Sequence, residues 1–208
     1  MIFQQILAGM MANFTYIVGC EKTKLAAVVD PPSDSSEIMR FAEENGLKIE
    51  MIFATHGHSD HVSGIRSLAE ETGAKVVAHK DDASGLQRGR IAVDMAVEDG
   101  QKLTVGDVEI EVIHTPGHTP GSMCLLADRK LMTGDTLFVG NCGRSDLPGG
   151  STKQLFESLH KKLKPLSDGI EVYPGHDYGD RPSSTIAHEK KTNPTLTCTT
   201  LEEFEMIP

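Results

Sequence analysis

Short apolar runs rich in β-branched residues alternate with amphipathic segments along the chain. The run at 25–29, Leu-Ala-Ala-Val-Val, leads to Asp30 and two prolines, so it predicts a buried strand that ends there. In the next segment Ile38 and Ala42 are spaced to share one face of a helix, which an Asn-Gly pair at 45–46 would end. Strands that alternate with helices are typical of layered α and β structure.

The same alternation extends to the C-terminal part of the chain. Helices are expected within residues 61–75, ending at Gly73, and 151–166, beginning at a capping box of Ser151 and Gln154. Further strands are predicted within residues 1–19, 49–61, 75–79, 108–118, 122–138 as a hairpin, and 169–179. Because no repeat or low-complexity linker interrupts this pattern, we predict one α/β domain over residues 1–208.

Four of the predicted strands end in side chains that can bind metals. One leads into Thr-His-Gly-His-Ser-Asp-His at 55–61, and His118, Asp135 and His176 each follow another strand. When strand ends converge on one edge of a sheet, their loops build a site on a rigid scaffold. We therefore predict that these four segments meet in one site.

The H-x-H-x-D-H spacing of the loop suits a pair of metal ions. Its first two histidines can bind one metal while its aspartate and last histidine bind a neighbour, because alternate residues of an extended loop point the same way. His118 and His176 would then complete the two shells, and Asp135 would bridge them. Two divalent ions roughly 3.5–4 Å apart generate a hydroxide near neutral pH and neutralise an oxyanion, which predicts hydrolysis. Structural roles are expected for the remaining His79, His114, His160 and His188.

Composition narrows the choice of partners. The 20 basic and 30 acidic residues give a formal charge of −10, which repels nucleic acid and anionic membranes. No run approaches the ~20 apolar residues of a membrane span, and residues 1–19 indicate strands rather than a signal peptide. Four scattered cysteines favour reduced thiols in a cytoplasmic protein. We expect a small-molecule substrate and no nucleic-acid or membrane partner, and a homodimer is one open arrangement.

Four motifs resemble those of the metallo-β-lactamase superfamily, in that family's order and over nearly the whole chain. They are T-H-G-H-S-D-H at 55–61, T-P-G-H-T-P-G at 115–121, T-G-D-T-L-F at 133–138 and Y-P-G-H-D-Y at 173–178. The resemblance implies an αββα four-layer sandwich, with two mixed β-sheets face to face, helices outside and a metal site at one edge. It also implies a first metal on His56, His58 and His118, a second on Asp60, His61 and His176, and Asp135 between them.

Two branches of that superfamily resemble this chain. One is the glyoxalase II-like thioesterases, or hydroxyacylglutathione hydrolases, which use two metals, and the other is the persulfide dioxygenases, which oxidise glutathione persulfide at a single iron. The dioxygenases have counterparts of the segments at 13–19, at 142–146, and of H-D-Y, S-S-T and N-P near the end. In that branch the Fe(II) ligands would be His56, His118 and Asp135, a two-histidine, one-carboxylate set.

The segment S-D-L-P-G-G-S at 145–151 instead resembles short thioesterase-like members. Little chain follows Asn193-Pro194, so we expect no helical C-terminal domain of the kind with which glyoxalase II enzymes grip glutathione, and the identity of the thiol stays open. We favour a hydrolase in which a metal-bridging hydroxide attacks a thiol-derived, glutathione-type thioester, with Asp60 and Asp135 as catalytic residues. A mononuclear Fe(II) persulfide dioxygenase is the alternative, and a non-catalytic metal-dependent binding module is the second.

Two further side chains are expected at the substrate. Arg144, nine residues after Asp135, is placed to clamp a substrate carboxylate, with a structural pair to Asp146 as the alternative. Tyr178, two residues past His176, would donate its hydroxyl to a thiol-linked substrate or simply pack.

Residues beside the ligands are expected to orient them. Asp30 is predicted to accept a hydrogen bond from the outer nitrogen of a ligating histidine. Thr55 and Thr115 are candidates for similar contacts through their hydroxyls, with ordinary turn chemistry as the alternative for either. Cys142 is interpreted as a packed thiol near the pocket. Zinc is the favoured metal, with iron and manganese as alternatives, because histidine and carboxylate accept all three.

Overall fold

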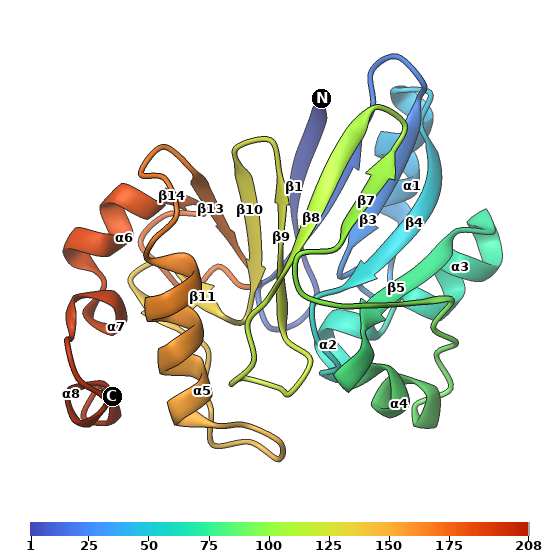
Figure 1. Ribbon diagram of the computed structural model, residues 1–208. Coiled ribbons are helices and arrows are strands. Elements are labelled where there is room, and N and C mark those ends of the chain that lie inside the picture. Colours follow the sequence, from blue (N-terminus) through green and yellow to red (C-terminus); the bar gives the residue numbers. More distant parts are fainter. Residues whose placement is uncertain (208) are drawn as a thin grey trace.

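The computed structural model describes residues 1–207 and arranges them in four layers, with two six-stranded sheets face to face and helices on the outside (Figure 1). The first sheet has the order β1 (Ile2–Ala8), β2 (Asn13–Gly19), β3 (Leu25–Val29), β4 (Lys48–Ala54), β5 (Lys75–His79) and β6 (Met95–Val97). The second has the order β14 (Ser184–Thr185), β13 (Glu171–Pro174), β10 (Lys130–Gly134), β9 (Met123–Ala127), β8 (Val108–His114) and β7 (Lys102–Val105). A short ribbon follows β10 and consists of β11 (Leu137–Phe138) and β12 (Asn141–Cys142).

Both sheets are mixed. In the first, β3, β4, β5 and β6 pair in parallel, whereas β1 and β2 are antiparallel to their neighbours. In the second, β10 and β13 are parallel and the other pairs are antiparallel. The predicted αββα sandwich of two mixed sheets is therefore confirmed.

The helices bury one apolar stripe each against a sheet. Ile38, Leu68 and Leu86 pack on the outer face of the first sheet, and the predicted leucine stripe of Leu155, Leu159 and Leu163 packs on the second. The helices over the first sheet are α1 (Ser36–Glu44), α3 (Ile65–Thr72) and α4 (Lys80–Arg88). Those over the second are α5 (Thr152–Glu157), the π-helical stretch η1 (Ser158–Leu163), α6 (Ile186–Thr192), α7 (Pro194–Thr197) and α8 (Leu201–Glu205).

A third apolar cluster fills the space between the two sheets. The first sheet contributes Tyr16, Phe53 and Val77, and the second contributes Ile110, Leu125 and Met132. Burial of these side chains holds the two sheets together in a fixed relative position. Loops from the two sheets can therefore meet in a fixed geometry at the common edge.

The prediction of one continuous helix within residues 61–75 is wrong. The structure has a short helix α2 (Ser59–Val62) and then α3, with a break at Gly64. Gly64 lies against the backbone of Pro31 and Pro32, and a Cβ there would clash with the carbonyl oxygen of Pro32. Gly73 ends α3 in a left-handed conformation, as predicted.

Among the elements that were not predicted from the sequence are α4, β6 and β7 and, near the C-terminus, β14, α7 and α8. In α4 one of the buried side chains is the polar Asp82, and Gly85 lies in the middle, so the helix lacks a clear apolar stripe. β6 and β7 have only three and four residues, which is too short for a periodic pattern to stand out.

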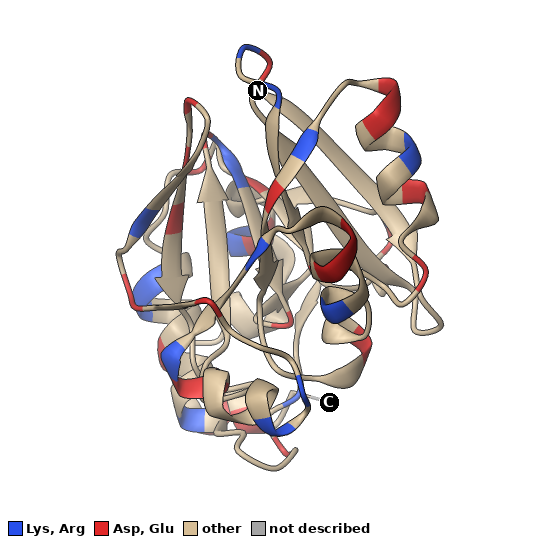
Figure 2. Cartoon of the chain, turned by 90° about the vertical axis from the view of Figure 1, so that its right-hand side faces the viewer, with Lys and Arg blue, Asp and Glu red and all other residues tan. Residues whose placement is uncertain are grey.

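Within residues 1–207, every helix is too short or too polar to cross a membrane. Acidic and basic segments are interspersed over the face seen in Figure 2. That mixture matches the modest excess of acidic residues in the sequence.

His160 gives a test of how the C-terminal helices respond to pH. Its Nε2 donates to the carbonyl of Thr195 at 3.0 Å, and burial lowers the pKa of the imidazole below 6.5. The unfolded chain then binds more protons as the pH falls below about 6.5, so folding stability decreases with acidification. His160→Gln keeps an N–H donor but cannot titrate.

We expect His160→Gln to match the wild type in thermal unfolding near pH 8. Between pH 7 and pH 5 its Tm should fall less than that of the wild type. The site histidines are common to both proteins, so the difference isolates His160. Equal decreases in Tm for the two proteins would contradict this assignment.

Candidate metal centre

The four predicted segments meet at one edge of the sandwich, where α2 lies at the lower end of the sheets in Figure 1. β4 leads into the loop that contains His56 and His58, and the loop between β8 and β9 contains His118. Asp135 follows β10, and His176 follows β13. The structure thus brings together all the side chains that the sequence analysis placed in one site.

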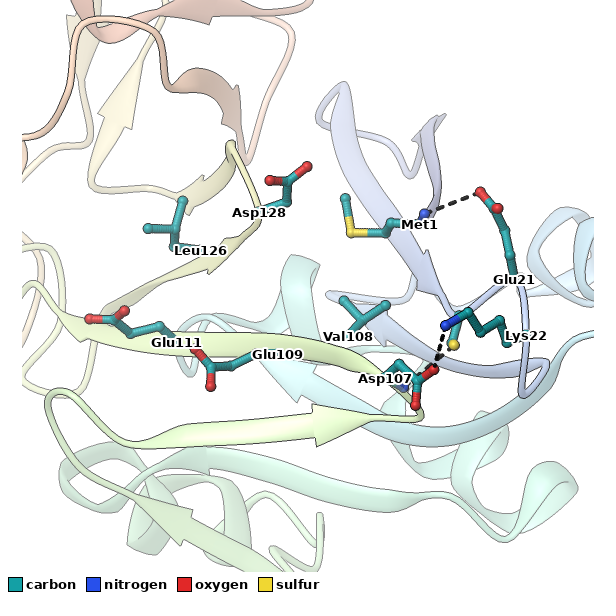
Figure 3. Close-up of a pocket in the computed structure, with 10 residues that line it drawn as sticks. Met1, Glu21, Lys22, Asp107, Val108, Glu109, Glu111, Leu126 and Asp128 are labelled. Carbon is teal, nitrogen blue, oxygen red and sulfur yellow. Dashed lines mark hydrogen bonds and ion pairs between the residues drawn. The ribbon is translucent and has the colours of Figure 1, made fainter.

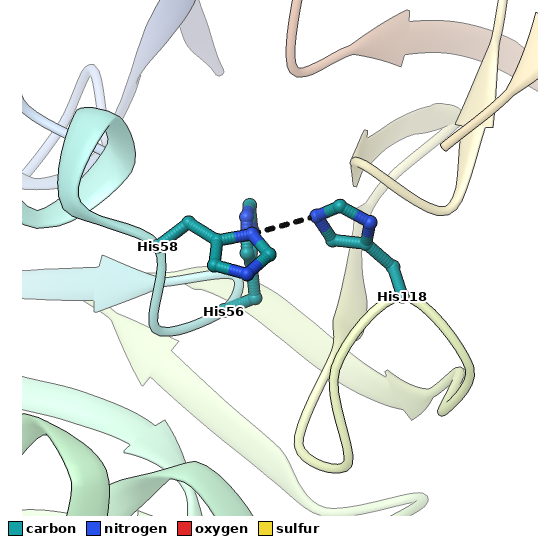
Figure 4. A group of neighbouring side chains, drawn as sticks. All are labelled: His56, His58 and His118. Carbon is teal, nitrogen blue, oxygen red and sulfur yellow. Dashed lines mark hydrogen bonds between the residues drawn. The ribbon is translucent and has the colours of Figure 1, made fainter. Parts of the chain in front are cut away.

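The first donor group consists of His56, His58 and His118. One nitrogen from each ring lies within 4.8 Å of the others, and Nδ1 of His58 is 2.9 Å from Nε2 of His118. Figure 4 shows that His56 and His58 come from one loop and that His118 faces them from another. The three rings therefore point into a common space.

The second donor group consists of Asp60, His61 and His176. Nε2 of His61 is 3.0 Å from Nε2 of His176 and 3.3 Å from Oδ2 of Asp60. Each donor group takes two side chains from the loop after β4 in the first sheet and one from a loop of the second sheet. The site therefore spans the boundary between the two sheets.

Asp135 lies between the donor groups. Its Oδ2 is 3.4 Å from Nε2 of His118 in the first group and 3.3 Å from Nε2 of His176 in the second. Its Oδ1 is 3.3 Å from Nε2 of His61. This position suits a carboxylate that serves both groups.

The expectation of one extended loop is wrong for the second half of the motif. His58 is extended, but Ser59–Val62 forms the helical turn α2, which contains Asp60 and His61. Alternation along an extended chain accounts for His56 and His58 only. The helical turn directs Asp60 and His61 toward His176, with which they form the second donor group.

Asp30 orients the loop after β4, as expected. Its backbone has the positive φ of 50° at the end of β3, and its carboxylate accepts bonds from the Thr55 amide at 2.7 Å and the Thr55 hydroxyl at 2.6 Å. Its Oδ2 also lies 2.9 Å from Nδ1 of His61. Thr115, however, bonds to Thr136 at 2.7 Å rather than to a site histidine, so that part of the expectation is wrong.

Backbone carbonyls orient two further histidines. Nδ1 of His118 lies 2.6 Å from the carbonyl of Arg144, and Nδ1 of His176 lies 2.9 Å from that of Met11. A carbonyl only accepts, so each Nδ1 donates and each Nε2 keeps its lone pair toward the site. These partners could not be found from sequence, because every residue has a carbonyl.

Asn13 is a site residue that the sequence analysis missed. It is 4% exposed and donates from Nδ2 to Oδ2 of Asp60 at 2.8 Å. It also forms a β-bridge with His176. The available signal was a polar side chain at the start of the otherwise apolar run at 13–19.

Electrostatics separate the histidines into two kinds. Burial lowers the pKa of His56 and His58, so both are neutral at neutral pH, as a metal ligand must be. Burial also acts to lower the pKa of His61. The negative charge of Asp135 and the hydrogen bonds of the His61 ring to carboxylates outweigh burial, so the pKa of His61 is raised. Conversely, burial would raise the pKa of Asp135, and the surrounding histidines hold it well below its ordinary value.

The donor set fits metal ions. Nε2 of His56 and Oδ1 of Asp135 are buried without a hydrogen-bond partner in the described chain, although buried polar atoms are nearly always bonded. Both atoms belong to the predicted ligands. Imidazole nitrogen and carboxylate oxygen are the ligands of zinc, iron and manganese sites.

A cavity of about 520 Å³ opens beside both donor groups. Phe138, Val139 and Tyr178 form part of an apolar wall, and the Tyr178 ring stacks on that of His176 with 4.5 Å between centroids. Arg144 also borders the cavity, but its guanidinium makes two 2.7 Å bonds to Asp146, the structural pair considered above. Among the other lining residues is Cys142, and burial raises the pKa of its thiol to about 12.

Another cavity, of about 490 Å³, lies beside Met1 and beside Asp107 in the turn between β7 and β8 (Figure 3). Cys20 and several carboxylates line it, and ion pairs link Met1 to Glu21 and Lys22 to Asp107. None of its described lining residues is a histidine. We place the functional site at the first cavity because members of both donor groups line it.

His79 and His114 form a separate stacked pair, with ring centroids 3.7 Å apart and Asp81 nearby. Nε2 of His114 lies 2.9 Å from the carbonyl of Pro120, so it donates there and has no lone pair to offer. These contacts match the structural role expected for both residues.

The family model described as Metallo-beta-lactamase superfamily matches residues 8–176. The chain belongs to this superfamily. Human persulfide dioxygenase ETHE1 (mitochondrial) is 32% identical over an alignment of 212 positions, and this alignment covers 99% of this chain and 80% of that protein. A hydroxyacylglutathione hydrolase of Anaeromyxobacter dehalogenans is 39% identical over 166 residues, which cover 80% of this chain and 62% of the hydrolase.

The crystal structure of ETHE1 from Myxococcus xanthus matches the fold with a TM-score of 0.91 and 34% identity, covering 100% of this chain and 92% of that one. This member of the metallo-β-lactamase superfamily is therefore a metalloenzyme with relatives named as a dioxygenase and as a hydrolase. The resemblance on which the sequence analysis relied is confirmed.

Replacing Asp30 tests how this superfamily member orients a donor. In Asp30→Asn an amide takes the place of one carboxylate oxygen, so Thr55 and His61 can no longer both find their acceptors. If the amide faces His61, that ring must accept at Nδ1 and carry its proton on Nε2, the atom that faces the site. Loss of the carboxylate that orients a ligating histidine typically lowers metal affinity by about 10–100-fold. We expect a decrease of this size in the zinc affinity of Asp30→Asn, measured by competition with a chelator.

Thr55→Ser keeps the hydroxyl and should bind zinc like the wild type. Wild-type zinc affinity in Asp30→Asn would show that Asp30 does not set the tautomer of His61.

Proposed function

We propose that this protein is a metal-dependent hydrolase that cleaves thioesters of small thiol-derived molecules. The observation that carries the proposal is the pair of complete donor groups, each of three side chains, on either side of Asp135. Seven donors exceed what one ion needs, and two ions leave coordination positions for water and substrate. The open cavity beside them is an argument against a closed, non-catalytic metal site.

The proposed ligands are His56, His58 and His118 for one ion, Asp60, His61 and His176 for the other, and Asp135 for both. When bound, the ions would supply an activated water as nucleophile and positive charge to neutralise the developing oxyanion. Zinc suits these ligands and needs no redox partner for hydrolysis, while iron and manganese accept the same atoms.

The chain's own residues have distinct tasks in this proposal. Asp60, held by Asn13 at 2.8 Å, orients the attacking water, and the low pKa of its carboxyl keeps it ionised. Asp135 fixes the two donor groups relative to each other. Tyr178, 55% exposed at the cavity mouth, has a raised pKa and keeps its hydroxyl proton to donate to the substrate sulfur. Arg144 would bind a substrate carboxylate after leaving Asp146.

A persulfide dioxygenase is the second candidate. The observation that favours it is that human ETHE1 aligns with 99% of this chain, whereas the hydrolase relative aligns with 80%. In this case His56, His118 and Asp135 would hold one Fe(II) and leave open positions for oxygen and a thiol. These three Fe(II) ligands are among the seven proposed for the hydrolase, so the metal content and the reaction must separate the two candidates.

The deciding experiment combines metal analysis with two assays on protein purified without added metal. Two zinc ions per chain, thioester hydrolysis and no oxygen uptake on glutathione persulfide are the results expected of the hydrolase. One iron per chain with rapid oxygen uptake would overturn the hydrolase in favour of the dioxygenase. Protein that binds metal but performs neither reaction would contradict both candidates.

A further inference from the structure

Asp82 is a buried carboxylate that is not a member of either donor group. It lies in the first turn of α4 and is 8% exposed. Three hydrogen bonds end on it, from the Thr119 hydroxyl at 2.7 Å, the Gly121 amide at 2.8 Å and the Gly57 amide at 3.0 Å. A buried carboxylate so fully bonded fixes the position of its partners.

These three partners belong to the two loops of the first donor group. Gly57 lies between His56 and His58, and Thr119 follows His118 directly. The carboxylate of Asp82 therefore ties the loop after β4 to the loop between β8 and β9. The hydrogen bonds found for its carboxylate include none to Asp60, His61 or His176, the second donor group.

The topology explains why Asp82 reaches both loops. β5 pairs in parallel with β4, with Ala78 opposite Ala54, so the end of β5 lies beside the start of the histidine loop. α4 begins directly after β5, and its first turn places Asp82 over that edge. At Gly121 a Cβ would come within 2.6 Å of Cγ of Asp82, which shows how closely the second loop packs on the carboxylate.

We propose that Asp82 is a positioning residue that sets the separation of the two loops of the first donor group and thereby its metal affinity. The proposal rests on the ligand assignment made above. It differs from the role of Asp30, which acts on His61 in the second group. Asp82 touches no ligand side chain through its three bonds and acts on the loop backbone and on Thr119.

Asp82→Asn removes one acceptor without changing the size of the side chain. Oδ1 accepts from Gly121, and Oδ2 accepts from Gly57 and Thr119. In either orientation the amide nitrogen faces a backbone N–H, so one loop loses its bond. Removal of such outer contacts typically costs about 10–100-fold in metal affinity.

The experiment is a titration of metal-free full-length protein with Zn²⁺ in competition with a chelator that resolves two binding steps. His58→Ala and His176→Ala identify which step belongs to which donor group. We expect Asp82→Asn to weaken the step of the first donor group by about 10–100-fold and to leave the other unchanged. Circular dichroism checks that each variant is folded.

Glu189→Gln is the matched control. Glu189 is also a buried carboxylate with three bonds, from Gly140, Ser184 and Asn193, none of which is in a donor group. Its replacement should lower the Tm and leave both zinc affinities unchanged. A loss of affinity in Glu189→Gln equal to that in Asp82→Asn would reduce the effect to general destabilisation and overturn the proposal.

Thr119 supplies a second, milder test. Thr119→Val removes the hydroxyl bond to Asp82 and should weaken zinc binding at the first donor group. Thr119→Ser keeps the hydroxyl and should bind zinc at this group like the wild type. Wild-type affinity at the first group in both Asp82→Asn and Thr119→Val would overturn the role of Asp82 while leaving the hydrolase proposal intact. A wild type that binds no zinc at this group would overturn the ligand assignment, and the role of Asp82 with it.

Discussion

Replacing Asp135 by alanine is expected to reduce turnover by about 10³-fold or more, since removal of a single transition-state donor already costs about 10²–10³-fold. Asp135 is within 3.4 Å of ring nitrogens from both donor groups, so its loss affects both ions at once. It would also leave His61 and His176 without the buried carboxylate that raises their pKa values. The measurement is kcat/KM for the substrate that the deciding assay identifies, together with metal content per chain.

Asp146→Ala is the control for that variant, because Asp146 is an exposed carboxylate bonded to Arg144 outside both donor groups. It should keep its metal content, and it frees the guanidinium of Arg144 from its partner without removing it from the cavity. Near-native turnover in Asp135→Ala would defeat the proposed division of the site into two groups served by one carboxylate.

Replacing Phe53 by alanine is expected to lower the free energy of unfolding by about 3–5 kcal/mol, the usual cost of truncating a buried aromatic side chain. Phe53 is 0% exposed in the cluster between the two sheets. A domain is typically stable by only about 5–15 kcal/mol, so this loss would remove a large share of the total. Urea unfolding followed by circular dichroism gives the free energy.

Met206→Ala, at a side chain that is 84% exposed, should change the same quantity by less than about 0.5 kcal/mol. A loss below about 1 kcal/mol in Phe53→Ala would mean that the cluster rearranges to fill the space, contrary to the packing described above.

Strand ends and donors were predictable because each has a local signature. The apolar run at 25–29 and the polar residue after it mark where β3 ends, and the histidine-rich segment at 55–61 marks the loop after β4. Parallel neighbours then bring such ends to one edge. The grouping of the seven donors was expected because the predicted strands end in them, and the structure brings these strand ends together.

Several contacts that depend on tertiary packing were not predictable. The break at Gly64 follows from its approach to Pro32, which is far away in sequence. The carbonyls of Met11 and Arg144 carry no side-chain signature, and Thr115 points to Thr136 although its motif suggested a contact to a histidine. Asp82 was hidden because a buried acid in a short helix resembles an ordinary first-turn residue.

The division of each donor group between the two sheets has a consequence for assembly. A cut in the connection between β6 and β7 would yield one piece with His56, His58, Asp60 and His61, and another with His118, Asp135 and His176. Neither fragment alone contains all three side chains of either donor group, so zinc binding would stabilise the docked pair relative to the separate pieces. Split halves that recombine only when the ion is supplied would make this enzyme a metal-triggered complementation pair.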